Sequence, residues 1–460
     1  MDAPDARAPD SGERSTEALS GDGAPPSGDA SSAGRAPAAL TGQHERMLLA
    51  VLAAAQFTNI VDFMIVMPLG PQLMASLEID PERFGAVIAA YSFAAGAAGL
   101  AASAVIDRFG RKSAFLSLYL GFILGTVCCG LATSYWSLVA SRTVTGGFGG
   151  VMGGMALAVI GDVFPEERRG RATGVLMSAF ALASVLGVPL GIKLGAMFDW
   201  HAPFLALAAL GVVILSLAWW AMPALPAHAA AVGRRPMATL IETLTRGDHW
   251  RAFSLIITVM LGSFAVIPYV STYLVRNVGI DEKTQLMWVF VAGGACTLVT
   301  APLAGRLADR FGRLWVYRLI APASAALMLV ITHLPRVGLP LAAATVAGLM
   351  VANSSRMVAA MALVNDSVEP RLRGGFMTAN SSLQHMASGL GVHVASLILA
   401  ETADGELAHY GVVGLLGAVT TLASIGVAAL VRPLRPPHPI TVAESVAAAA
   451  EVTADADELL

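Results

Sequence analysis

Residues 305–313 read GRLADRFGR, and a second version of this stretch occurs earlier in the same chain. There, residues 103–112 read SAVIDRFGRK, so the shared core DRFGR stands at positions 107–111 and 309–313, which differ by 202. Each copy is a short charged island between two long apolar runs. A repeat of this period in a very hydrophobic chain predicts two homologous bundles of membrane helices.

Composition points to a membrane protein. Hydrophobic residues make up 56% of the 460 and charged residues 13%, with a mean hydropathy of +0.67, whereas about a quarter of a soluble domain is charged. The apolar runs reach the roughly 20 residues that cross a bilayer. We therefore expect an all-α integral membrane protein in a lipid bilayer, and neither an enzyme nor a nucleic-acid-binding protein.

The net charge of −3 conceals a basic central region. Residues 1–46 and 433–460 each carry −4, which leaves +5 for the rest. Residues 1–44, rich in Ala, Pro, Gly, Ser and Asp, are predicted to be a disordered tail, and 433–460 form a second tail. The N-terminus lacks a cleavable signal-peptide pattern, so the first membrane segment is expected to act as the insertion signal. We expect no cofactor or metal, and packing roles for three cysteines in apolar runs: Cys128, Cys129 and Cys296.

Twelve apolar segments divide into six and six around a longer connection. They give a first bundle over 45–222, a linker over 223–250 and a second bundle over 251–432. The sequence Asp80-Pro81-Glu82 is typical of a helix start, with an acidic N-cap followed by proline. The segments are predicted at about 47–77, 81–106, 113–132, 136–164, 172–198, 203–222, 252–278, 284–307, 314–333, 338–364, 374–399 and 407–431.

The linker contains apolar residues at helical spacing: Met237, Leu240, Ile241 and Leu244. This spacing fits an amphipathic helix on the membrane surface, and a solvated linker remains an equal alternative.

Further matched positions keep the two halves in register. Ile79-Asp80 matches Ile280-Asp281 at an offset of 201, and the pattern Asp162…Arg169-Gly170 recurs as Asp366…Arg373-Gly374 at 204. Basic residues gather in the loops of one side, which predicts that this side and both termini are cytoplasmic. The loops of that side hold Arg108, Arg111, Lys112, Arg168, Arg169, Arg171, Arg234, Arg235, Arg246, Arg251, Arg310, Arg313, Arg371 and Arg373, whereas the opposite loops hold Arg83, Arg276, Lys283 and Arg336.

Twelve segments in two halves, with DRFGR after segments 2 and 8, resemble the major facilitator superfamily over about residues 45–432. The family's loop motif is roughly G-x-L-x-D-R-x-G-R-K; the first copy has Ser103 for its opening glycine, and the second has Leu314 for its lysine. The resemblance implies the major facilitator fold, two pseudo-symmetric six-helix bundles. No Walker-type phosphate loop occurs, so nothing supports ATP-driven transport.

Three shorter motifs resemble the drug:proton antiporter branch. GVPLG at 187–191 is similar to its antiporter motif, with Val188 inserted as in sugar- and drug-efflux members. RTVTG at 142–146 matches the family's R-x-x-x-G, and DFMIVMP at 62–68 is similar to an acidic-then-proline signature of efflux pumps.

Asp62 lies near the middle of an apolar segment, where an ionised side chain costs about 3 kcal/mol. Gln56, Asn59 and Asp62 recur every three residues and share a helix face. We hypothesise that this face lines a central cavity and binds substrate, and that Asp62 is a proton-coupling site. Arg142 is the expected partner, in a pair that protonation and substrate would compete for; a static structural pair is the alternative.

Other polar residues in the segments are candidate substrate contacts. Arg356, beside Asn353, could bind an anionic substrate group or a helix-end carbonyl. A polar stripe on segment 11 could face the cavity or hold helices together. The stripe contains Asn380, Gln384 and Ser388, with His385 adjacent, and further candidates at plausible depth are Tyr91, Met152, Met155, Tyr269 and Tyr273.

The DRFGR loops are expected to act as gates. The resemblance implies that Asp107 accepts hydrogen bonds from a helix start in the opposite bundle, while Arg108 and Arg111 pair with acids such as Asp162. Glycines recur every fourth residue at 146, 150 and 154 and at 187, 191 and 195, which predicts close helix packing. The other gating candidates are Gly110, Gly305, Asp309, Arg310, Gly312, Arg313, Gly187, Pro189 and Gly191, of which Gly187 and Pro189 are expected to bend segment 5 where the halves meet.

Together these features predict a monomeric transporter of a bacterial inner membrane that exports small amphipathic molecules, in exchange for protons, by alternating access. Sugar or metabolite efflux, or proton-coupled uptake, on the same fold is the nearest alternative. A receptor or scaffold that transports nothing is the alternative from another class, and it would need no buried Asp–Arg pair.

Overall fold

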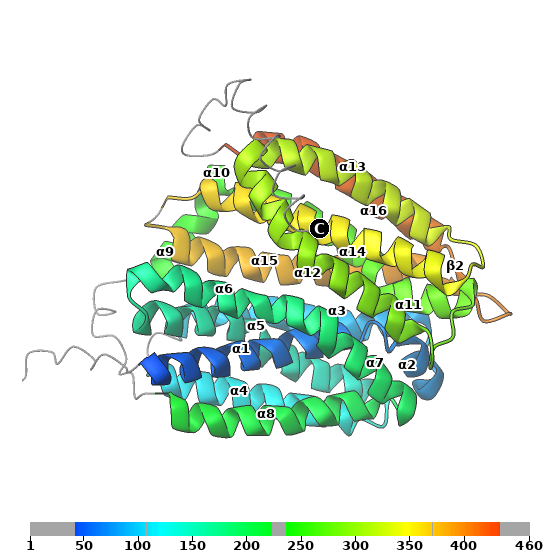
Figure 1. The fold of residues 1–460 in the computed structure, drawn as a ribbon, viewed down its shortest axis with the longest axis horizontal. Helices are drawn as coiled ribbons and strands as arrows, with labels where there is room; N and C mark the ends of the chain where they lie inside the picture. The colour runs from blue at the N-terminus through cyan, green and yellow to red at the C-terminus, as the bar shows by residue number, and fades with distance from the viewer. Residues whose placement is uncertain (1–41, 106–108, 223–235, 370, 433–460) are drawn as a thin grey trace, which may run out of the picture. The chain divides into compact units, whose positions relative to one another are not determined.

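The computed structural model describes residues 42–105, 109–222, 236–369 and 371–432. Both tails and much of the linker lie outside this set, so their predicted disorder stays a prediction. Residues Gln43–Leu460 form one compact unit. Within it, the helices of the first half lie beside those of the second half (Figure 1).

Each of the twelve predicted segments contains a helix. In the first half these are α1 (Gly42–Ile65), α2 (Gly70–Leu77), α3 (Pro81–Val105), α4 (Arg111–Gly130), α5 (Tyr135–Val163), α6 (Glu166–Leu182), the π-helix η2 (Ala183–Gly187), α7 (Val188–Met197) and α8 (His201–Ala221). The remainder comprises α9 (Pro236–Thr245), α10 (Gly247–Val266), the short 3-10 helix η4 (Ile267–Tyr269), α11 (Val270–Tyr273), the π-helix η5 (Leu274–Val278), α12 (Leu286–Phe311), α13 (Arg313–Thr332), α14 (Leu339–Asp366), α15 (Arg373–Ile398), strands β1 (Ala400–Glu401) and β2 (Leu407–Ala408), and α16 (Tyr410–Leu430).

Eleven helices of the described residues are long and apolar enough to cross a membrane. The exception among the predicted segments is α15, which is 26 residues long but carries the polar stripe. Tryptophans support the same membrane placement, because their rings favour the two bilayer interfaces. Trp136 lies at the start of α5 and Trp220 at the end of α8, at opposite ends of the bundle, and each side chain is 74% exposed.

The first helix of each half breaks at a matching position. Segment 1 is not continuous: α1 ends at Ile65, and Pro68 lies in the turn before α2. In the second half α10 ends at Val266, and Pro268 lies in η4. Proline lacks a backbone N–H and cannot continue the helical hydrogen bonds. The two helix ends differ by 201 positions, so the halves repeat this break.

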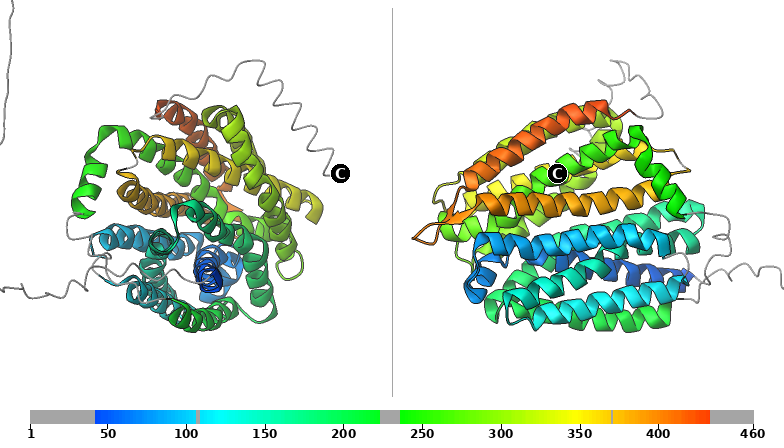
Figure 2. Two further views of the ribbon diagram at one scale, coloured as in Figure 1. Left: turned by 60° about the vertical axis from the view of Figure 1, so that its left-hand side comes forward. Right: turned by 180° about the vertical axis from the view of Figure 1, so that it is seen from behind.

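Two sets of helix contacts join the halves. In one set α3 packs against α15, and the two lie side by side in Figure 2; in the other, α12 packs against η2 and α7. Small residues allow the close approach: a Cβ on Gly96 would lie 2.9 Å from the backbone oxygen of Ser382, and one on Gly294 would lie 2.7 Å from that of Ser184.

The hairpin end of the bundle is the end that carries the β1–β2 hairpin (right in Figure 1). Its apolar core contains residues from both halves, including Phe84 and Tyr269. The hydroxyl of Tyr269 donates to the carbonyl oxygen of Pro81 at 3.2 Å, and Gln72 hydrogen-bonds Glu282. Burial raises the pKa of Glu282, which lies in the connection before α12. The halves are therefore joined at this end.

The linker end, opposite the hairpin end, carries α9. The predicted amphipathic helix forms, and it packs against α3 and α15. Leu240 is buried and Ile241 exposed. Two ion pairs join α9 and its C-terminal flank to the connection between α14 and α15: Arg371–Glu242 at 2.6 Å and Arg246–Glu369 at 3.0 Å. The linker helix is thus docked on the bundle and is not merely solvated.

Candidate functional site

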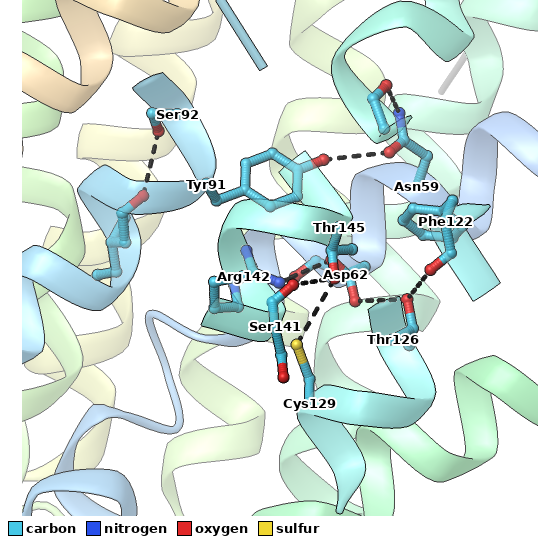
Figure 3. Close-up of polar contacts among 12 residues, drawn as sticks. Asn59, Asp62, Tyr91, Ser92, Phe122, Thr126, Cys129, Ser141, Arg142 and Thr145 are labelled. Atoms are coloured by element: carbon cyan, nitrogen blue, oxygen red, sulfur yellow. Dashed lines mark hydrogen bonds and ion pairs between the residues drawn. The ribbon is translucent and has the colours of Figure 1, made fainter. Parts of the chain in front are cut away.

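Asp62 and Arg142 form a fully buried ion pair between α1 and α5 (Figure 3). Nη1 of Arg142 lies 2.7 Å from Oδ2 of Asp62 and 3.3 Å from its backbone oxygen. Thr126 of α4 donates to Oδ1 at 3.2 Å. Nε and Nη2 of Arg142 are buried without a hydrogen-bond acceptor. The carboxylate therefore has one charged and one neutral partner, and the guanidinium has unused donors.

Tyr91 of α3 connects this pair to the polar face of α1. The guanidinium of Arg142 lies over the Tyr91 ring, 4.4 Å from its centroid. The Tyr91 hydroxyl donates to Oδ1 of Asn59 at 3.1 Å, and Nδ2 of Asn59 donates to the backbone oxygen of Gly149 at 3.2 Å. Only glycine fits at 149, since a Cβ there would lie 2.6 Å from Oδ1 of Asn59 and 2.6 Å from the hydroxyl oxygen of Tyr91. The structure thus brings four predicted positions together: Asn59, Asp62, Tyr91 and Arg142.

Gln56 and Met155 lie on the same two helices. Gln56 is half-buried, and its Oε1 has no donor. Met155 is 3% exposed. The spare acceptor of Gln56 could accept a hydrogen bond from a bound molecule, whereas Met155 contributes apolar surface.

Arg356 is the second fully buried arginine, and its partners are neutral. Nη2 donates to Oγ of Ser263 at 2.6 Å and to Oδ1 of Asn353 at 2.7 Å. Nη1 donates to Oγ1 of Thr421 at 2.5 Å. Nε of Arg356 and Nδ2 of Asn353 are buried without acceptors. Helices α10, α14 and α16 supply this cluster.

The polar stripe of α15 contacts helices of the second half, whereas His385 beside it contacts the first half. Nδ2 of Asn380 and Nε2 of Gln384 each lie 3.8 Å from the sulfur of Met361 on α14. His385 points its ring edge-to-face at Phe63 of α1, with centroids 6.3 Å apart. Phe63 also packs against Phe264 of α10 at 5.8 Å. An aromatic cluster of Phe63, Phe264 and His385 therefore lies between the halves.

The two other predicted tyrosines lie apart from the Asp62–Arg142 pair. Tyr269 and Tyr273 belong to the apolar core of the hairpin end. Tyr273 donates to the backbone oxygen of Leu334 at 3.1 Å, and Tyr269 bonds Pro81 of the other half. Each hydroxyl donates to a backbone oxygen of another segment, so both tyrosines join helix ends together.

The last arginine of each DRFGR motif pairs with the aspartate that ends a neighbouring helix. Nε of Arg111 lies 2.7 Å from Oδ2 of Asp162, and Arg313 pairs with Asp366 at the equivalent place. Arg313 also lies 3.5 Å from Asp309. Each pair stays within its own half, so neither joins the two bundles directly.

Among the remaining motif residues, two glycines shape the turns that lead into α4 and α13. Gly110 is the N-cap of α4, and Gly312 adopts a φ of +93° between α12 and α13, which favours glycine. Arg310 lies over the Phe311 ring at 5.9 Å. A Cβ on Gly305 would meet only Val358, at 3.8 Å. Asp107 and Arg108 lie outside the described residues.

The glycines of segment 5 pack within their own half. Cβ atoms at Gly187, Gly191 and Gly195 would lie 2.2, 2.3 and 2.6 Å from Val61, Ile65 and Leu69. Pro189 follows the π-helix η2, which supplies the expected irregularity. Both η2 and α7 contact α12 of the second half, and Ser184 of η2 lies against Gly294, so the irregular part of segment 5 lies where the halves meet.

Segment 4 packs closely through only part of its glycine series. A Cβ on Gly146 would lie 2.3 Å from the Tyr91 backbone oxygen, and one on Gly150 would lie 2.5 Å from Cα of Ala95. Gly154 has nothing within 4 Å. The prediction of close packing was therefore wrong for Gly154.

Sequence reasoning missed Thr126, Thr421 and Ser263. Hydroxyl residues in apolar helices are common, and nothing in their spacing marks the two threonines. Ser263 could have been found, because it lies 201 positions after Asp62, the offset that relates Asp80 to Asp281.

Known proteins resemble this chain in sequence and in fold. The model of the Major Facilitator Superfamily matches residues 52–281 and 252–454. A probable sugar efflux transporter of Helicobacter pylori is 26% identical over 52% of this chain and 60% of the relative. A chloramphenicol resistance protein of Streptomyces lividans is 29% identical over 57% of this chain and 66% of the relative. The chain thus matches less than two thirds of the length of these curated relatives.

A solved structure of a bacterial homologue of the human lysosomal transporter Spinster, inward-facing and unoccupied, superimposes with a TM-score of 0.63. It is 16% identical, with 85% of this chain and 95% of that chain covered. At this identity the likeness establishes the fold of two six-helix bundles. Since the family model also covers both halves, the chain belongs to the Major Facilitator Superfamily, a family of membrane transporters.

Proposed function

We propose that the chain exports small amphipathic, drug-like molecules in exchange for protons by alternating access. The observation that carries this proposal is the Asp62–Arg142 pair, which is fully buried and has few other partners. A charged group inside a membrane is costly and commonly marks a transport or proton pathway. Removing the charge of one member leaves the other unpaired, so the pair can couple protonation to binding.

In the proposed cycle, a proton binds the carboxylate of Asp62 and breaks its ion pair with Arg142. The outgoing molecule binds while Asp62 is deprotonated and paired with Arg142, beside the unused donors of the guanidinium, so its binding on the inner side favours loss of the proton there. Protonation of Asp62 from the outer side favours release of the molecule, and rocking of the bundles exposes the site to each side in turn.

The loop pairs contribute at the linker end in this proposal. Arg111–Asp162 and Arg313–Asp366 fix the helix ends within each bundle. The bundles would then move as rigid bodies, with Asp107 and Arg108 forming the gate between them. The basic loops support a cytoplasmic linker end and cytoplasmic termini, in a bacterial inner membrane.

A second candidate is efflux of sugars or other polar metabolites. It is favoured by the sugar efflux relatives and by the hydrogen-bonding groups of Gln56 and Asn59. Proton-coupled uptake would use the same residues in the opposite direction.

The test is proton release from the purified chain on addition of chloramphenicol, glucose or arabinose. Wild type is compared with Asp62→Asn and with the control Asp199→Asn, whose carboxylate is 60% exposed. We expect chloramphenicol to release protons from wild type and the control but not from Asp62→Asn. Release by the sugars instead would favour the second candidate, and equal release from all three proteins would refute the role of Asp62.

A further inference from the structure

The buried arginines of the two halves have different partners. Arg142 has a carboxylate at 2.7 Å, whereas Arg356 contacts two hydroxyls and one amide oxygen. Among the described residues, none of the ion pairs involves Arg356. Both arginine side chains are 0% exposed. A positive charge in an apolar interior is strongly unfavourable unless an anion compensates it.

Ser263 occupies the place in the second half that Asp62 occupies in the first. The two residues differ by 201 positions, as do the ends of α1 and α10 that follow them by three residues. Each accepts a hydrogen bond from its half's buried arginine. The second half therefore keeps the helix break and has a hydroxyl in place of the carboxylate, while its buried arginine stands ten residues beyond Val346, the position 204 residues after Arg142.

The cluster around Arg356 also has donors to spare. Nε of Arg356 and Nδ2 of Asn353 are buried and lack acceptors. Unsatisfied buried donors are rare and usually indicate an absent partner. The missing group must accept hydrogen bonds, and the charge of Arg356 favours a negative one. A carboxylate meets both needs, since its two oxygens accept from a guanidinium.

The aromatic cluster of Phe63, Phe264 and His385 shares helix α10 with the Arg356 cluster. Phe264 follows Ser263 in α10, and its ring packs against Phe63 of the first half, which His385 also contacts. We propose that Arg356 and Asn353 bind the carboxylate of the transported molecule, while the aromatic cluster contacts its apolar part. This inference rests on the proposed function, and it adds amphipathic monocarboxylates to the drug-like molecules proposed there.

The test compares 2-naphthoate with 2-naphthamide, which share a ring system and differ in charge. Binding to the purified full chain is measured calorimetrically at equilibrium, with no proton gradient. Hydrogen bonds to a charged group predict that wild type binds the acid about ten- to a hundredfold more tightly than the amide. Arg356→Gln should reduce this preference to about twofold or less.

A second variant covers the case in which Arg356→Gln fails to fold. Ser263→Asp supplies an internal carboxylate to Arg356 and should abolish the preference while raising the melting temperature. Thr258→Asp, on the same helix but facing elsewhere, is the matched control and should keep the preference. A Ser263→Asp variant that still prefers the acid would overturn the assignment.

Two further results would also overturn it. One is a wild type that does not distinguish acid from amide, including one that binds neither. The other is a preference that excess chloride abolishes, because the site would then hold an inorganic anion. Asp62→Asn should retain the preference, so failure of proton coupling and failure of carboxylate recognition are observed separately.

Discussion

The free energy of the Asp62–Arg142 pair depends on both charges being present. Desolvation opposes each charge, and their mutual attraction offsets that cost only while the pair is intact. Thr126 adds one hydrogen bond to the carboxylate, whereas two donor atoms of Arg142 remain unused. The pair is consequently sensitive to any change in the charge of either residue.

Arg142→Met should therefore destabilise the chain more than the loss of one contact suggests. We expect a loss of about 3 kcal/mol in the free energy of unfolding, because Asp62 would stay buried and unpaired. Denaturant unfolding of the purified chain measures this. The control Arg246→Met removes a half-exposed pair with Glu369 and should cost less than about 1 kcal/mol.

The double variant Asp62→Asn/Arg142→Met removes both charges and should recover part of that loss. If the two single effects instead add fully in the double variant, the residues do not interact as a pair.

Among the helices, the distance to the neighbouring helix decides at which positions packing requires a glycine. Gly146 lets α5 approach the backbone of α3, whereas Gly154, eight residues later on α5, has open space around it. Spacing along the sequence gives both residues the same expected role, since every fourth residue shares a helix face. Only the path of the neighbouring helix separates them, because α3 meets one part of α5 and not the other.

Gly146→Ala and Gly154→Ala should thus have opposite effects on thermal stability. The first forces a methyl group to within 2.3 Å of a backbone oxygen, and overpacking of this kind costs about 1–3 kcal/mol. The second should be neutral or stabilising by up to about 1 kcal/mol, since alanine favours a helix over glycine. Equal melting temperatures for the two variants would contradict the close approach of α3 and α5.

Most helices could be predicted from the sequence, and most side-chain partners could not. Apolar length locates the twelve segments, and the repeat relates the halves, because both properties are local or periodic. The break after α1 was missed, since Pro68 alone does not say whether a helix bends or ends. Partners such as Thr126 for Asp62 depend on how α1 and α4 meet, which no local pattern records.

At the scale of the whole molecule, the two ends of the bundle differ in how they join the halves. The hairpin end has a shared apolar core, the Tyr269–Pro81 hydrogen bond and the Gln72–Glu282 contact. At the opposite end, Arg111 and Arg313 each pair with an aspartate of their own half, and α9 packs against α3 and α15. Glu282 lies at the hairpin end, so its protonation should act on how the halves join there.

Closure of the hairpin end should depend on pH through Glu282. Burial raises its pKa in the closed state, so its contribution to closure is present below the usual glutamate pKa of about 4.3 and is lost as pH rises through the raised value. Spin labels at Glu78 and Asp404, in a background with alanine at the three cysteines, should move apart as pH rises. The measurement is the distance between the two spin labels as a function of pH.

Glu282→Gln should remove the pH dependence and keep the labels close together. Glu406→Gln, which alters a half-exposed carboxylate paired with Arg336, is the control and should behave as wild type. A distance that does not change with pH in wild type would contradict the role of Glu282.

Helix α15 has a consequence for how the chain is made. It is the one predicted membrane segment that falls short of the eleven strongly apolar helices, yet it packs between α3 and α10. A translocon that sorts nascent segments by hydrophobicity would release α15 into lipid poorly on its own. We therefore expect its insertion to be assisted by helices that are made earlier: α3 and α10 pack against it, and Met361 of α14 contacts Asn380 and Gln384. The stripe that makes α15 interesting for binding also makes it the segment whose biogenesis depends most on its neighbours.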